Sequence, residues 1–161
     1  MSSSVYVQDM IVSWSDFHRK AKMLAENLLN RRKWDGIIAV TRGGLYPAGI
    51  IARELNIQKI DTICVRSYSG QTRGEPELLK TAAGDGENIL IVDDLVDSGN
   101  TARFIRKILP KGYFVTVFAK PEGKPVVDEF VESVPQDTWI RFPWDTDISF
   151  MEPLADLKGK R

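Results

Sequence analysis

Three aspartates and a run of small residues lie close together near the middle of the chain. Residues 92–101 read VDDLVDSGNT, between the apolar run 89–92 and a predicted helix at 102–109. The small residues after Asp97 can offer backbone N–H groups and hydroxyls to an anion, and the start of the helix adds partial positive charge. The pattern therefore predicts a site for a phosphate ester with carboxylates beside it.

The three carboxylates suit separate tasks. Because side chains alternate along a strand, Asp93 and Asp94 should point to opposite sides and not share a proton. Each could then accept hydrogen bonds from vicinal sugar hydroxyls or ligate a hard cation. Asp97 stands beside the predicted phosphate site, where a carboxylate needs a task such as taking a proton from a bound base. The alternative is an ordinary strand-to-helix turn with a helix cap.

A second loop with anion-binding chemistry follows the apolar run 37–40. Residues 41–44 read TRGG and precede a helix that we expect to start at Pro47. The two glycines let the backbone approach a ligand, and Arg42 supplies a permanent positive charge, so the loop suits pyrophosphate oxygens. Such a turn also arises for backbone reasons alone, and that alternative stays open.

The segment 92–101 resembles the diphosphoribosyl-binding signature of the type I phosphoribosyltransferases. Four further blocks are similar, in order and spacing, to the bacterial xanthine-guanine branch of that family: IIAVTRGGL at 37–45, FAKP at 118–121, PQDTWI at 135–140 and PWD at 143–145. The resemblance extends over nearly the whole chain, from about residue 14 to residue 145.

The resemblance implies a sugar donor, phosphoribosyl pyrophosphate, held together with Mg²⁺, which Asp94 would contact. It also implies a cis peptide bond between Arg42 and Gly43 and an arginine in a lid. The residues that would contact the donor are Arg42, Gly43, Arg73, Asp93, Asp94, Leu95, Val96, Asp97, Ser98, Gly99, Asn100 and Thr101.

Lys120 ends an apolar run, where a charged amine must reach solvent or a ligand. The resemblance implies that Lys120 binds the six-position oxygen of a purine and that Asp97 takes the proton of the imidazole ring, so these two are the predicted catalytic residues. It also implies that Trp139 stacks on the purine and that the carbonyl of Ile140 binds its two-position substituent. A tryptophan packed in the core is the competing interpretation of Trp139.

The apolar runs 37–40, 61–65, 88–92 and 114–119 alternate with helical patterns, which predicts an α/β fold with a mainly parallel sheet covered by helices. An amphipathic helix is expected after Ser15 as its N-cap, with Phe17, Ala21, Leu24 and Leu28 on its buried face. Ligands bind at the carboxyl ends of such strands, where the chemistry-bearing residues fall. The resemblance implies the type I phosphoribosyltransferase fold.

The 161 residues are expected to form one domain. A small hood is expected over about 121–161. The stretch 67–86 is too long for a simple connection and is interpreted as a mobile lid, with an idle insertion as the alternative.

Charge and composition narrow the function classes. Lysine plus arginine and aspartate plus glutamate number 22 each, so no global basic field favours nucleic acid. The single cysteine, Cys64, is expected to be buried and inert, and the single histidine, His18, to lie on the surface. No secretory or membrane-spanning run is present, which predicts a cytoplasmic protein. The resemblance implies that the protein forms a homotetramer and associates weakly with the inner face of the membrane.

These expectations lead to one activity and two rivals. The protein would transfer phosphoribosyl to guanine and xanthine, and more weakly to hypoxanthine, in purine salvage. One rival is a hypoxanthine-guanine enzyme of the same fold. The other is a regulatory protein that senses the donor and binds DNA or RNA, against which the balanced charge argues.

Overall fold

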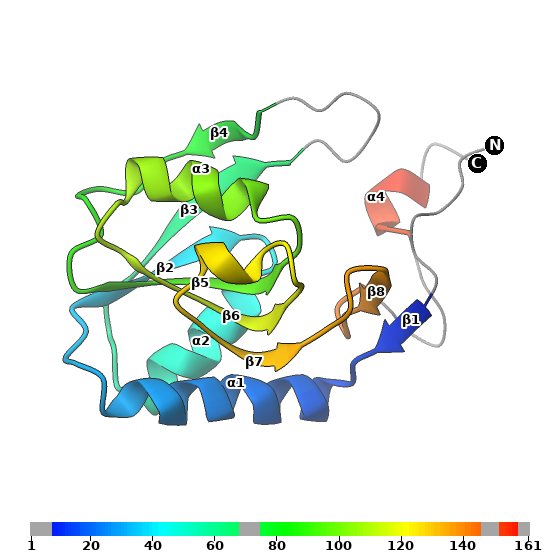
Figure 1. Ribbon diagram of the computed structural model, residues 1–161, viewed down its shortest axis with the longest axis horizontal. Coiled ribbons are helices and arrows are strands. Elements are labelled where there is room, and N and C mark those ends of the chain that lie inside the picture. Colours follow the sequence, from blue (N-terminus) through cyan, green and yellow to red (C-terminus); the bar gives the residue numbers. More distant parts are fainter. Residues whose placement is uncertain (1–7, 68–74, 146–151, 158–161) are drawn as a thin grey trace. The chain divides into compact units, whose positions relative to one another are not determined.

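The computed structural model describes residues 8–67, 75–145 and 152–157. The chain divides into two compact units, of which residues 20–136 form the larger and residues 1–19 with 137–161 the smaller. Figure 1 shows the elements of both in sequence colours.

A six-stranded sheet forms the centre of the larger unit, with strand order β4-β3-β2-β5-β6-β7. All neighbouring strands are parallel except β3 and β4, which are antiparallel. The predicted α/β fold with a mainly parallel sheet is confirmed. The strands are β2 (Gly36–Thr41), β3 (Ile60–Arg66), β4 (Glu77–Lys80), β5 (Ile89–Val96), β6 (Tyr113–Ala119) and β7 (Glu129–Ser133).

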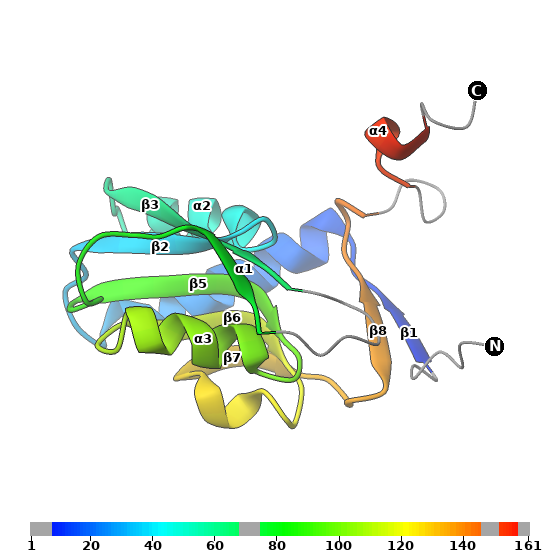
Figure 2. The ribbon, with the colours of Figure 1, turned by 90° about the horizontal axis from the view of Figure 1, so that it is seen from above.

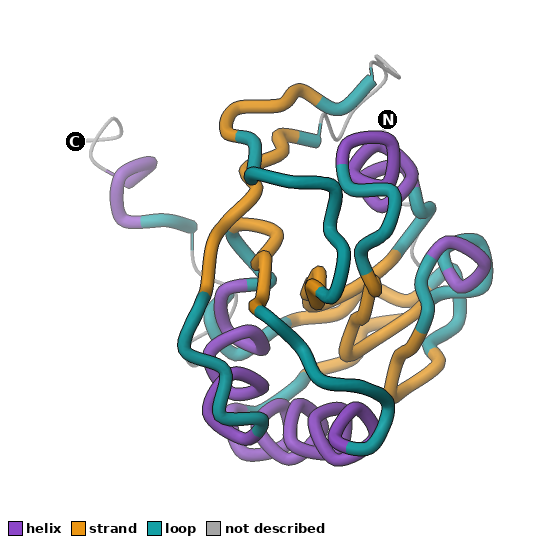
Figure 3. Tube along the Cα trace, turned by 90° about the vertical axis from the view of Figure 1, so that its left-hand side faces the viewer, coloured by secondary structure: helices purple, strands orange, loops and turns teal. Residues whose placement is uncertain are grey.

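Helices cover both faces of this sheet. In Figures 1 and 2, α2 (Leu45–Glu54) lies on one face and α3 (Asn100–Ile108) on the other. Loops and turns, teal in Figure 3, join the helices to the strands. A short 3-10 helix, η1 (Lys124–Val126), follows β6. The β2-α2-β3 and β5-α3-β6 crossovers lead in opposite directions from the centre of the sheet, so right-handed connections place their helices on opposite faces.

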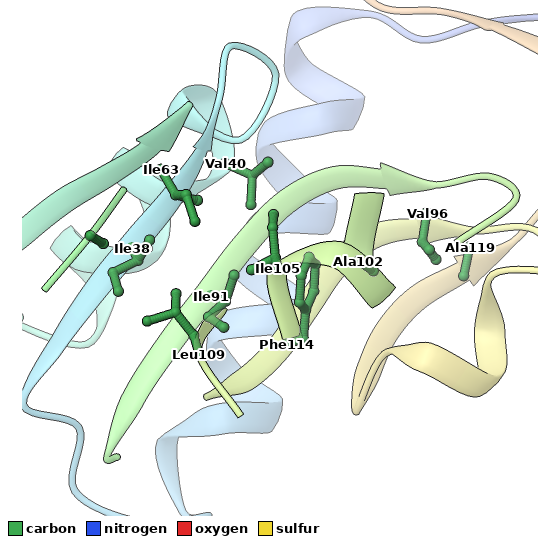
Figure 4. Packing of buried hydrophobic residues seen from close by; sticks show 11 residues of the cluster. Ile38, Val40, Ile63, Ile91, Val96, Ala102, Ile105, Leu109, Phe114 and Ala119 are labelled. Atoms are coloured by element: carbon green, nitrogen blue, oxygen red, sulfur yellow. The ribbon is translucent and has the colours of Figure 1, made fainter. Parts of the chain in front are cut away.

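The core beneath α3 joins this helix to the central strands of the sheet. Ile105 and Leu109 are fully buried and pack over Ile91 and Phe114, as Figure 4 shows. Full burial of each such side chain contributes about 1.5–3 kcal/mol. The strands are therefore fixed against α3, and the loops at their carboxyl ends are held on a rigid support.

The first helix, α1 (Trp14–Leu29), begins earlier than expected. The hydroxyl of Ser13, not that of Ser15, accepts the N–H of Asp16 at 3.1 Å, so the N-cap is two residues earlier. A serine at either position can cap a helix, and the sequence alone does not distinguish them. The predicted apolar face is confirmed, because all four of its members are fully buried: Phe17, Ala21, Leu24 and Leu28.

Two other helix starts also differ from the prediction by two residues. Helix α2 begins at Leu45 rather than at Pro47, directly after Gly44. Helix α3 begins at Asn100 rather than at residue 102, because Gly99 adopts a φ of 86° and acts as the N-cap. Glycine accepts this left-handed conformation without steric cost, so the turn can end and the helix can start at once.

Part of the stretch 67–86 is regular structure. Strand β4 pairs with β3, and Ala82 is buried in the core. Lys80 donates to Asp61 Oδ1 at 2.9 Å and to the carbonyl of Thr62 at 2.7 Å, so it braces the edge of the sheet. The prediction of a loop throughout 67–86 is wrong at 77–80, because β4 is exposed along its whole length and lacks the alternation that marks a strand.

The smaller unit contains a second, two-stranded sheet. Strand β1 (Gln8–Ile11) pairs in parallel with β8 (Thr138–Arg141), and Arg141 donates twice to Asp9 Oδ2, at 2.8 and 3.0 Å. The rings of Phe142 and Trp144 stack at 4.6 Å, and Phe17 meets Trp144 edge-on at 4.9 Å. A short helix, α4 (Leu154–Leu157), follows.

Residues 121–161, where a hood was expected, are divided between the two units. Helix η1 and strand β7 belong to the larger unit, where β7 extends the main sheet beside β6. The segment that pairs with the C-terminal strand comes instead from the N-terminal part of the chain. No helix among the described residues is long and apolar enough to cross a membrane.

Candidate functional site

The central strands of the larger unit end at one edge of the sheet. Strands β2, β5 and β6 are parallel neighbours, so their carboxyl ends lie side by side. The loops that follow them carry Arg42, Asp97 and Lys120 respectively. The predicted convergence of the two loops and the lysine at one edge is confirmed, and this edge is where ligands bind in sheets of this kind.

The loop after β2 lies against a carboxylate of β5. A Cβ added to Gly43 would be 2.2 Å from Oδ2 of Asp94, and a Cβ on Gly44 would be 2.3 Å from the carbonyl oxygen of Val92. Close approach of β5 thus accounts for Gly44 on backbone grounds, whereas Gly43 leaves room for the Asp94 carboxylate. Arg42 is exposed, as a group that meets an incoming anion must be.

A cis peptide bond occurs in this loop between Thr41 and Arg42. The expected position was the bond between Arg42 and Gly43. The prediction is therefore wrong by one residue.

Asp93 and Asp94 interact with each other, and the prediction that they act separately is wrong. Burial raises the pKa of Asp93 well above its ordinary value, and the charge of Asp94 and a hydrogen bond between the two side chains raise it further. The backbone N–H of Asp94 donates to Asp93 Oδ1 at 2.9 Å, which opposes the shift but does not cancel it. Strand alternation does not separate two short carboxyls enough to make them independent in a poorly solvated site.

These two carboxyls are the candidates for a cation site. No group of three or more His, Cys, Asp or Glu side chains within the described ranges could hold a metal ion unaided. Mg²⁺ is commonly bound by one or two carboxylates together with water and substrate phosphates, so a carboxyl pair fits it when an anionic substrate supplies further oxygens. A cation would also relieve the repulsion that raises the pKa of Asp93.

The turn after β5 has the form of an anion cradle. Gly99 turns the chain into α3, and the N–H of Asn100 points to the hydroxyl of Ser98 at 3.4 Å. The hydroxyls of Ser67 and Thr101 lie 2.8 Å apart and join the end of β3 to the first turn of α3. Small side chains and a helix N-terminus together favour a phosphate here.

Arg103 is a neighbour of this turn that the sequence analysis missed. Its Nη1 donates to the carbonyl of Ser98 at 3.0 Å and to Oδ1 of Asn100 at 3.3 Å. The guanidinium therefore braces the turn from the first turn of α3 and adds positive charge beside it. Its position three residues after the N-terminal residue of the helix was the available signal.

Asp97 and Lys120 form an ion pair, with Lys120 Nζ 3.0 Å from Asp97 Oδ2. The Lys120 side chain is only 1% exposed, whereas that of Asp97 is 39% exposed. Gln136 Nε2 donates to the other oxygen, Asp97 Oδ1, at 2.7 Å. Lys120 does not reach solvent, so that part of the expectation is wrong; its charge is balanced by a carboxylate of the same site.

Two other predicted site residues lie within a strand of the sheet and not in a loop. Leu95 and Val96 are within β5, where they pair with Phe118 and Ala119 of β6. The Val96 side chain is buried in the core, and its carbonyl accepts the N–H of Lys120 at 2.9 Å.

Trp139 and Ile140 lie on β8 of the smaller unit. Trp139 is 42% exposed, so the competing interpretation as a core tryptophan is wrong, while Ile140 is buried. Arg73 lies outside the described residues. His18 is on the surface as predicted, and Cys64 is half-buried rather than fully buried.

Known proteins match this chain over almost its full length. It is 50% identical to a xanthine-guanine phosphoribosyltransferase of Chromohalobacter salexigens over 161 residues, covering 100% of this chain and 99% of that protein. It is 52% identical to one of Desulfotalea psychrophila over 153 residues, covering 94% and 96%.

A solved structure extends the match to the fold. The purine phosphoribosyltransferase of Pyrococcus horikoshii is 28% identical, with a TM-score of 0.74, over 90% of this chain and 99% of that one. Residues 7–150 match the family described as the phosphoribosyl transferase domain. With the carboxylates, the turn after β5 and the lysine gathered at one sheet edge of the expected fold, the chain belongs to the phosphoribosyl transferase family.

Proposed function

We propose that the protein transfers the phosphoribosyl group of phosphoribosyl pyrophosphate to a ring nitrogen of guanine or xanthine, releasing pyrophosphate and forming the purine nucleotide. The observation that carries this proposal is the meeting of a phosphate turn, a carboxyl pair and the Asp97–Lys120 pair at one sheet edge. The names of the full-length relatives support the choice of base.

The donor's groups match the chemistry of this edge. The turn 98–101 binds the phosphate on the sugar, since its small residues and the start of α3 favour an anion. Asp93 and Asp94 bind the ribose hydroxyls, whose O–H groups their carboxyl oxygens can accept. Arg42 and the backbone at Gly43 bind the pyrophosphate, with Arg73 as a further contact.

Mg²⁺ is the proposed cofactor, with Asp94 as its protein ligand. When bound, the ion supplies positive charge that stabilises the departing pyrophosphate. The pair Asp93–Asp94 fits this role because it concentrates carboxylate oxygen in a poorly solvated place beside the loop that faces the donor. Arg42 adds charge to the same leaving group.

The base is activated by Asp97. As the bond from the ribose to the purine nitrogen forms and the bond to pyrophosphate breaks, the imidazole proton passes to the carboxylate. A carboxylate has about four lone-pair positions, and the contacts to Lys120 and Gln136 use two of them, so Asp97 can accept a purine N–H as well. Lys120 stabilises negative charge on the six-position oxygen.

A steady-state assay of the purified protein with donor, Mg²⁺ and each of three bases tests the proposal. We expect guanine first, xanthine second and hypoxanthine last, because hypoxanthine leaves a partner of the two-position group unpaired. Such a loss costs about 1–3 kcal/mol, or roughly ten- to hundredfold in kcat/KM. If hypoxanthine equals or exceeds xanthine, the protein is a hypoxanthine-guanine enzyme. Donor binding without turnover on any base would favour a donor-sensing regulator instead.

The proposed assembly is a homotetramer in the cytoplasm, with weak peripheral association with the inner membrane face. Large apolar side chains that are exposed in the larger unit suit contacts between copies, among them Leu45, Tyr46, Leu78 and Leu79. Light scattering of the purified protein measures its mass, and a monomer would contradict the tetramer. Cell fractionation tests the location, and recovery only in an exported fraction would contradict it.

A further inference from the structure

Gln136 makes two directed contacts with its side-chain amide. Its Nε2 donates to Asp97 Oδ1 at 2.7 Å, and its Oε1 accepts the backbone N–H of Glu122 at 3.0 Å. All three residues belong to the larger unit, although Gln136 is 39 positions from Asp97 in the chain. The side chain therefore links the loop after β6 to the turn after β5.

The two contacts determine which way the amide points. If the amide were reversed, its oxygen would face the Asp97 carboxylate and its NH₂ group would face the N–H of Glu122, and both contacts would be repulsive. The backbone N–H of Glu122 thus holds the amide with its donor towards Asp97. The Nε2 group of Gln136 is therefore a donor of fixed orientation.

Asp97 is consequently held at both oxygens. Lys120 donates to Oδ2 at 3.0 Å and Gln136 to Oδ1 at 2.7 Å. A carboxylate held by one donor can still rotate about its Cβ–Cγ bond, whereas two donors from different loops fix its plane. The backbone of the turn is supported nearby as well, because a Cβ on Gly123 would be 2.8 Å from the carbonyl oxygen of Asp97.

We infer that Gln136 is a positioning residue for phosphoribosyl transfer, which fixes the Asp97 carboxylate in the orientation that accepts the purine proton. The inference rests on the proposed function. It assigns no contact between Gln136 and substrate, since the side chain acts through Asp97. A general base has to meet its proton at hydrogen-bonding distance, so loss of orientation lowers the rate of the chemical step more than it lowers donor binding.

Stability is expected to change little when this contact is lost. Asp97 is 39% exposed, so water can replace the missing donor without leaving a buried group unpaired. A role in folding and a role in positioning therefore predict different results for the same variant.

The test compares Gln136→Leu with the wild type and with Gln58→Leu. Gln58 is a matched control, because its amide also donates to a side chain, Asn56 Oδ1 at 3.2 Å, but lies on the exposed surface after α2. We expect Gln136→Leu to lower kcat about 10- to 100-fold with a donor KM within about twofold of wild type, and Gln58→Leu to change neither. Gln136→Glu, which keeps the shape and the acceptor but replaces the donor by a carboxylate, should lose at least as much.

The same substitution in an Asp97→Asn background separates positioning from a structural role. If Gln136 acts through Asp97, Gln136→Leu should lower kcat by less than about twofold there, because the effects of residues that act as a unit do not add. An equal loss in both backgrounds, or unchanged kcat in both Gln136 variants, would overturn the inference. Inactivity of the wild type and of Gln58→Leu with every base would instead contradict the proposed function.

Discussion

A single methyl group on Gly43 should displace the Asp94 carboxylate without changing any charged residue. In Gly43→Ala the new Cβ would be 2.2 Å from Oδ2 and 2.6 Å from Cγ of Asp94, whereas ordinary contact lies at 3.4–4 Å. The carboxyl must therefore move by about 1 Å, and a misplacement of that size can cost about 100-fold in rate. Overpacking of this kind lowers the free energy of unfolding by about 1–3 kcal/mol.

The assay for Gly43→Ala is kcat/KM for the donor at several Mg²⁺ concentrations, with melting followed in parallel. We expect kcat/KM to fall about 100-fold, with a greater need for Mg²⁺ than in the wild type. Gly49→Ala is the matched control, because nothing lies within 4 Å of a Cβ at this helical position. That control should keep its activity and gain about 0.5–1 kcal/mol of stability. The reasoning is refuted if folded Gly43→Ala handles the donor as well as Gly49→Ala does.

Three further substitutions or removals test other parts of the site. Asp97→Asn should lower kcat by about 10²–10⁴-fold while donor affinity changes little. Single-turnover kinetics and donor-binding measurements check this, and near-normal turnover would exclude Asp97 as the general base. Chelation should abolish activity and added Mg²⁺ restore it, so full activity in excess chelator would remove Mg²⁺ from the mechanism. Because the pKa of Asp93 is raised in the fold, its stabilising contribution is full below the ordinary carboxyl pKa and is lost as pH rises through the raised value. At pH about 8, Asp93→Asn should therefore have a higher melting temperature than the wild type, by about 2–4 °C for each kcal/mol of stability gained. This difference in melting temperature should shrink below pH about 4. A melting temperature below that of the wild type at pH about 8 would contradict the expected direction of the effect.

The central strands could be predicted because each is a continuous apolar run that is covered on both faces. The edge strands were missed for the opposite reason. All four residues of β4 are exposed, and β7 is half-buried, so neither carries a strong hydrophobic signal. The pairing of β1 with β8 joins segments more than a hundred residues apart, and no local pattern in either segment specifies the partner.

In the candidate site, too, some features could be predicted from the sequence and others could not. Asp93, Asp94 and Asp97 are contiguous with a strand and a turn, so their approximate placement follows from local sequence. The interaction of Asp93 with Asp94 depends on how poorly solvated the two groups are, which only packing determines. The hydrogen bond from Gln136 to Asp97 depends on the course of the chain beyond β7, although Gln136 itself lies in the block 135–140 that resembles the family.

The ion pair of Asp97 and Lys120 has a consequence for the charge balance of the proposed reaction. A fully buried ammonium requires a negative partner nearby, and Asp97 Oδ2 supplies one at 3.0 Å. In the proposed reaction Asp97 becomes neutral as it takes the purine proton, and until the bond to the ribose is complete the negative charge that develops on the purine is shared by its six-position oxygen. An ammonium has three donors, so Lys120 can bond to Asp97 and to a purine oxygen in the same complex. The proton transfer then moves negative charge from one partner of Lys120 to another without removing it from the lysine's surroundings, which lowers the electrostatic cost of activating the base.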